Sequence, residues 1–158
     1  MSEIIESKFL IPLDGRWIDD ERFMLLSDLQ YQSALLGGII TVPKGFVTDF
    51  ASVPRVPFIY EAFGDRAHHE SVVHDFLYQT HEIPLEVIVE VTNEIKIVIT
   101  LIGKAKADYI FKEAMICRKK PFYIYEGMYL GVVLGGAASY ASGPERFKVL
   151  NPEPQIIF

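Results

Sequence analysis

The chain has 158 residues, which suits one domain of ordinary size. Half of the residues are apolar and 13% are aromatic, so the chain can build a packed core and is not a disordered or low-complexity sequence. Its net charge of −6 makes it a poor candidate for binding nucleic acid through the phosphates. The single cysteine, Cys117, excludes an internal disulfide framework and a zinc site made of several cysteines.

The first fifty residues predict β-structure. The apolar run FMLL begins at Phe23, residues 28–32 alternate in part, and GIITV over residues 38–42 predicts a strand that ends at Pro43. Pro54 and Pro57 exclude a regular helix directly afterwards, so an ordered loop is expected there.

Two amphipathic helices are predicted further along the chain. Residues 66–80 contain no glycine or proline, and Asp65 can cap this first helix. Residues 104–119 have apolar side chains at helical spacing, and Pro121 ends this second helix. Between the two, residues 85–102 are rich in β-branched side chains, which favours a β-hairpin and leaves a long helix as the alternative.

The C-terminal third is apolar and then proline-rich. Residues 127–141 are too few to span a bilayer, so we expect a buried, glycine-rich core helix, with an interfacial or membrane-associated segment as the alternative. Residues 144–158 carry three prolines and are expected to form an extended tail after a single domain over residues 1–143.

These elements predict an α+β fold in which a small antiparallel sheet packs against two or three helices. The expected core consists of Leu25, Ile39, Val42, Phe46, Val72, Val73, Phe76, Leu77, Ile110, Phe111 and Met115.

The motif HDFLY on the first predicted helix is the leading candidate for chemistry. His74 and Tyr78 are four residues apart and share one helix face, whereas Asp75 points about 100° away. Neutral imidazole can accept a proton near neutral pH, and a buried carboxylate requires a partner. A satisfied core histidine is the alternative for His74.

Three charged residues from other segments can complete such a site. Asp49 lies in the proline-rich loop, where it either caps a turn or joins the site, and Arg55 can tether Asp49 or Asp75. Asp108 lies inside the second helix, where it either joins the site or pairs with a lysine one turn away. A zinc site built from His68, His69 and His74 and a nucleophilic Cys117 are the weaker alternatives.

Three blocks of the sequence resemble the family called domain of unknown function 1353. They are GIITVPKGFVTDFASVPR at residues 38–55, VVHDFLY at residues 72–78 and KADYIFKEAM at residues 106–115. The family is spread through tailed bacteriophages and prophages, so the resemblance implies a phage-encoded protein without implying a settled activity. The run at residues 85–102 is longer than the family's usual connection and is a candidate contact element.

The motif also resembles the helical core of secreted phospholipases A2. This resemblance implies His74 as the base, Asp75 as a calcium ligand, Asp108 as the carboxylate that orients the base and Tyr78 as its support. Calcium is the one cofactor that it implies. Ser52, Asp49 and Arg55 are the expected supporting or binding residues, although the glycine-rich calcium loop and the disulfides of that family are absent.

Two functional hypotheses follow. In the first, the protein is a component of a phage tail or connector, located in the virion or in the host cytoplasm during assembly, with a buried His/Asp network. It then contacts other phage structural proteins, further copies of itself and, as an open alternative, the host envelope. In the second, it hydrolyses an ester or amide of the host envelope with His74 and Asp108.

Overall fold

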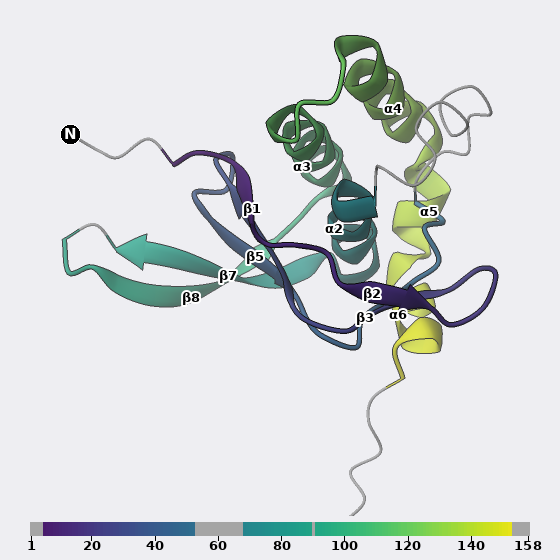
Figure 1. Ribbon diagram of the computed structural model, residues 1–158, viewed down its shortest axis with the longest axis horizontal. Coiled ribbons are helices and arrows are strands. Elements are labelled where there is room, and N and C mark those ends of the chain that lie inside the picture. Colours follow the sequence, from purple (N-terminus) through teal and green to yellow (C-terminus); the bar gives the residue numbers. More distant parts are fainter. Residues whose placement is uncertain (1–4, 53–67, 90, 153–158) are drawn as a thin grey trace, which may run out of the picture.

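The computed structural model describes residues 5–52, 68–89 and 91–152, and it confirms the predicted α+β class (Figure 1). The larger sheet contains, in spatial order, β1 (Lys8–Ile11), β4 (Leu29–Ser33), β5 (Gly38–Val42), β7 (Glu82–Val89) and β8 (Glu94–Leu101). The smaller sheet contains β2 (Gly15–Trp17), β3 (Phe23–Leu25) and β6 (Val47–Thr48). All strand pairs are antiparallel.

Five helices are present in the described segments. They are α2 (His68–Thr80), α3 (Lys104–Cys117), α4 (Phe122–Gly135), α5 (Ala137–Ala141) and α6 (Gly143–Leu150). Helix α2 lies between the sheets and the other helices, in contact with α3 and α6, and α4 packs on the far side of α3 (Figure 1). The first predicted helix is therefore confirmed from residue 68 onward, while its predicted start at residues 65–67 lies outside the described residues.

The pleat of β4 and β5 sets which side chains enter the core. Alternate residues of both strands are buried, so Tyr31 and Ile40 point inward and Ile39 points outward. Every predicted core residue except Ile39 is buried, and that prediction is wrong because it placed Ile39 on the wrong face of the strand.

The β-branched run folds as the predicted β-hairpin of β7 and β8, so the alternative of a long helix is wrong. Asn93 in the turn has a φ of 59°, a left-handed conformation that asparagine tolerates better than most residues. The hairpin extends beyond the rest of the sheet, and β8 forms its edge (Figure 1).

The apolar segment at residues 127–141 is only partly a buried helix. Helix α4 buries the stripe of Ile124, Met128 and Val132, whereas Leu130 and Leu134 on its other side are 56% and 77% exposed. Across the described ranges, every helix falls short of the length and apolarity needed to cross a membrane.

The prediction of an extended tail from residue 144 is wrong for the part that the structure describes. Residues 143–150 form α6, which packs against α2. Pro144 lies in the first turn of α6, where its missing N–H costs no helical hydrogen bond and its fixed φ favours the helix. Proline there begins a helix instead of preventing one.

The close approach of α6 to α2 depends on Gly143. A Cβ at this position would collide with the backbone carbonyl of Tyr78. We expect Gly143→Ala to lower the free energy of unfolding by about 1–3 kcal/mol in urea titrations. Gly135→Ala is the matched control, because a Cβ there has nothing within 4 Å. The control should leave stability unchanged or raise it by up to ~1 kcal/mol, and equal losses in both variants would contradict the docking of α6 on α2.

Candidate active site

His74 lies in the middle of α2 and is held at both ring nitrogens. Its side chain is fully buried. Nε2 is 3.0 Å from Oδ1 of Asp108, and Nδ1 is 3.2 Å from Oγ of Ser52. Because an ionised carboxylate only accepts hydrogen bonds, Nε2 carries the proton and Nδ1 presents a lone pair to the Ser52 hydroxyl. The three side chains therefore form one chain of donors and acceptors that runs from Ser52 to Asp108.

Asp108 is fixed on α3 by two further donors. The Tyr78 hydroxyl, one turn after His74 on the same face of α2, donates to Oδ1 at 2.5 Å. Lys104, one turn before Asp108, donates to Oδ2 at 2.7 Å. The same ammonium group donates to the carbonyl of Val132 at 2.9 Å, near the C-terminal end of α4. Asp108 thus has a fixed orientation and a partner for its charge.

The surroundings of this cluster set its protonation state. Burial lowers the pKa of His74 below 6.5 and outweighs the attraction of Asp108, whose charge is already balanced by Lys104. Burial alone would raise the pKa of Asp108, but the hydrogen bonds from His74, Lys104 and Tyr78 outweigh it and lower that pKa. Near pH 7 the cluster accordingly contains a neutral imidazole beside an ionised carboxylate, which is the state that a general base requires.

Asp75 belongs to a different cluster on another side of α2. Its fully buried carboxylate accepts hydrogen bonds from Thr48 at 2.5 Å and Gln79 at 2.6 Å, and an ion pair joins it to Arg146 of α6 at 3.4 Å. Arg146 also lies 3.2 Å from Oδ1 of Asp49. Arg146 therefore makes the contacts that were expected of Arg55, which lies outside the described residues.

The groups around Asp75 do not fit the calcium ion that the sequence suggested. Calcium needs several oxygen ligands, whereas Thr48, Gln79 and Arg146 all donate hydrogen bonds to this carboxylate. Within the residues that the structure describes, no cluster of three acidic, histidine or cysteine side chains is arranged to hold a metal. Asp75 fits the role of a buried partner for Arg146.

A family model described as "Protein of unknown function (DUF1353)" matches residues 23–132. The chain belongs to this family. The segment matched by the DUF1353 model includes Ser52, His74, Tyr78 and Asp108, while Arg146 lies beyond it.

Two other comparisons found nothing. No curated protein and no solved structure matches the chain. The resemblance to secreted phospholipases A2 therefore has no support from them.

The structure brings together four of the predicted site residues and separates two. Ser52, His74, Tyr78 and Asp108 meet in one cluster, whereas Asp49 and Asp75 meet at Arg146. Asp49 also has the turn-capping role that was its alternative prediction, because its carboxylate accepts a hydrogen bond from the Ala51 amide at 3.0 Å.

One contact and one residue of these clusters were not predicted from the sequence. The contact of Ser52 with Nδ1 gave no signal, because a loop residue has no periodicity that could place it. Arg146 was missed because an extended tail was expected there. Lys104 lies four residues before Asp108, and this spacing predicts the ion pair that the two residues form.

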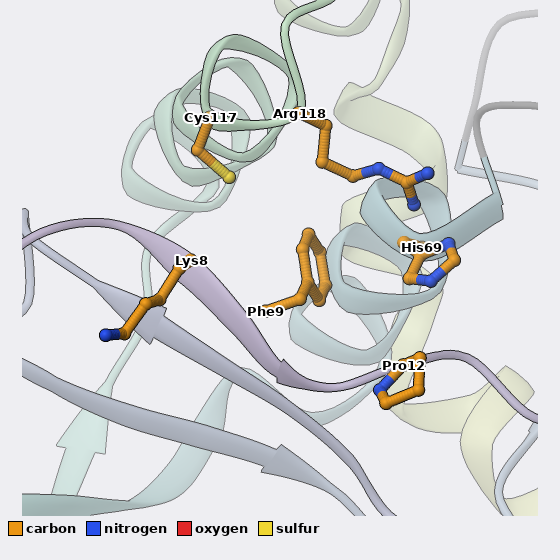
Figure 2. Close-up of a pocket in the computed structure, with 6 residues that line it drawn as sticks. All are labelled: Lys8, Phe9, Pro12, His69, Cys117 and Arg118. Atoms are coloured by element: carbon orange, nitrogen blue, oxygen red, sulfur yellow. The ribbon is translucent and has the colours of Figure 1, made fainter.

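A hollow of about 210 Å³ lies elsewhere, between β1, α2 and the end of α3 (Figure 2). Phe9 lies among its lining residues, which also include His69, Cys117 and Arg118. Burial raises the pKa of Cys117 to about 11, so its thiol stays protonated at neutral pH. His69 accepts a hydrogen bond at Nε2 from the Leu13 amide, and among the described residues it forms no metal-holding cluster with His74. This hollow has no activated nucleophile.

The lowered pKa of His74 predicts a pH dependence of stability. Below pH 6.5 the unfolded chain binds a proton at this residue and the folded chain does not, so stability falls as pH decreases. The contribution reaches at most ~1.4 kcal/mol per pH unit. Urea unfolding at pH 7.5 and 5.5 should show a smaller pH effect in His74→Gln than in the unmodified chain. His69 and His81 remain in both proteins and act as the internal control, and equal pH effects would contradict a neutral buried His74.

Proposed function

We propose that the protein is a hydrolase of esters or amides in which Ser52 is the nucleophile, His74 the base and Asp108 the residue that orients the base. The observation that carries the proposal is the single hydrogen-bond chain from the Ser52 hydroxyl through the imidazole to the carboxylate. The order of groups is that of the serine–histidine–aspartate arrangement found on unrelated folds, which is recognised by geometry and not by sequence position.

The chemistry follows from the tautomer. The Ser52 oxygen attacks the carbonyl carbon of the substrate, forms the new C–O bond and gives its proton to Nδ1 of His74. The imidazolium then protonates the leaving alcohol or amine as its bond to the carbonyl carbon breaks, which leaves an acyl group on Ser52. Water, deprotonated by Nδ1, attacks this ester, and the returning proton restores Ser52 as the carboxylic acid leaves.

Asp108 and its two further donors support these steps. The carboxylate stabilises the imidazolium, and it keeps the proton on Nε2 so that Nδ1 always faces Ser52. Lys104 and Tyr78 hold that carboxylate in place. Because His74 is fully buried and Ser52 is 3% exposed, the leaving group and the water have to reach Nδ1 from the side of the Ser52 hydroxyl.

Labelling with a fluorophosphonate probe, together with hydrolysis of p-nitrophenyl esters of increasing chain length, tests this proposal. We expect the probe to label Ser52 of the folded protein. Ser52→Ala should abolish labelling and reduce ester hydrolysis at least ~100-fold, and Asp108→Asn should also reduce it about 10²–10⁴-fold because an amide no longer fixes the tautomer.

Ser33→Ala is the matched control. Like Ser52, Ser33 is a buried serine whose hydroxyl is hydrogen-bonded. Its partner is the carboxylate of Glu113 at 2.8 Å and not His74. Its variant should lose stability and keep labelling. Failure of the probe to label Ser52, with His74→Ala only lowering the melting temperature, would show that the cluster is a structural network. Retained hydrolysis in Ser52→Ala with loss in His74→Gln would make water the nucleophile.

A second role in a phage particle is favoured by a separate observation. Five large apolar side chains of strands β7 and β8 are each more than half exposed, an arrangement typical of a surface that another molecule covers. We propose accordingly that the protein is a tail or connector component that carries its hydrolytic site to the host envelope, and that it occurs in the host cytoplasm during assembly.

Mass spectrometry of purified particles checks this second role. The expected result is a fixed number of copies per particle that survives washing in high salt. Its absence from complete particles would contradict the role and leave the hydrolase proposal standing.

A further inference from the structure

The outer face of the β7–β8 hairpin is apolar and acidic. Its exposed side chains are Ile88, Ile95, Ile97, Ile99 and Leu101, from 55% to 72% exposed, and we call them the hairpin face. Cross-strand pairing places them on one side of the sheet, together with Glu82 and Glu86. Over residues 82–101 the sequence has four glutamates and one lysine.

The side of α4 turned away from α3 is apolar too, and the segment that leads into α4 is basic. Tyr123, Leu130 and Leu134 are 56% to 77% exposed and follow one another at helical spacing, and we call them the helix face. The segment that leads into α4 is Arg118-Lys119-Lys120, in which Lys119 is exposed and Arg118 is ion-paired with Glu70. Figure 1 shows the two faces on different parts of the molecule, the hairpin extending from the sheet and α4 above α3.

We infer that the hairpin face of one copy binds the helix face of a second copy. A helix laid on an open sheet face is a standard way to bury both apolar surfaces, and each copy offers one of each. The eight-residue strands span about 27 Å and the fourteen-residue helix about 21 Å, so the lengths are compatible. The glutamates beside one face and the basic segment beside the other make this pairing electrostatically complementary.

This contact joins two different surfaces and therefore continues from copy to copy. Depending on the rotation between neighbours, such a head-to-tail contact closes into a ring or grows into a filament. Pairing of two hairpin faces would instead place two acidic faces against each other, so charge favours the head-to-tail contact over a symmetric one. The inference goes beyond the hydrolase proposal and does not depend on it.

Sedimentation velocity with two blocked variants tests the inference. Ile97→Asp removes the hairpin face and Leu130→Asp removes the helix face, each at a residue exposed enough for the fold to tolerate the change. We expect the unmodified chain to associate at concentrations up to about 100 μM and each variant to be monomeric, with affinity at least ~100-fold weaker. An equimolar mixture of the two variants should form a dimer that does not grow, because each variant retains one intact face.

Val149→Asp is the control, since Val149 is 79% exposed on α6 and belongs to neither face. It should associate as the unmodified chain does. Circular dichroism melts identify any variant that has lost its fold, and Tyr123→Asp and Ile99→Asp then replace it. A monomeric unmodified chain, a monomeric mixture, or self-association of Leu130→Asp alone would each overturn the inference. Fluorophosphonate labelling of Ser52 should be the same in both variants, so this test and the test of hydrolysis can fail separately.

Discussion

A helix that is buried on every side and still carries polar residues is the constraint on which this structure depends. Residues 70–79 of α2 are all buried, and they include His74, Asp75 and Gln79. Each buried polar group needs a partner, since an unsatisfied one costs roughly 1–3 kcal/mol. The partners come from different elements: Asp108 from α3, Thr48 from β6 and Arg146 from α6. The polar residues of α2 thus decide which elements surround it.

The same constraint gives the candidate active site its order. Asp108 accepts from three donors, so its position and charge are fixed before any substrate binds. His74 has no second orientation that keeps both of its hydrogen bonds, and the buried location keeps it neutral. The network that stabilises the fold is therefore also the arrangement on which the proposed hydrolysis depends, and Ser52 lies at one end of it.

The sequence predicts what local periodicity and spacing can determine. The β-branched run predicts the hairpin, and the four-residue spacing of His74 and Tyr78 places both on the side of α2 that meets α3. Contacts between residues far apart in the chain have no such signal. Arg146 was missed because Pro144 was interpreted as a break, although proline in the first turn favours a helix. Ile39 was misplaced because a run of four apolar or β-branched residues does not fix which face of the strand is buried.

The ion pair of Arg146 with Asp75 has a consequence for synthesis on the ribosome. Asp75 and its helix are translated 71 residues before the arginine. Until α6 leaves the exit tunnel, the carboxylate lacks its cation and α2 cannot be enclosed without leaving that charge unpaired. In a growing chain that has reached only α4, burying the unpaired carboxylate of Asp75 costs free energy. A partly hydrated α2 is therefore favoured, and the domain closes once α6 is present. Nascent chains that end before residue 146 therefore keep apolar surface of the domain exposed, as incomplete domains do.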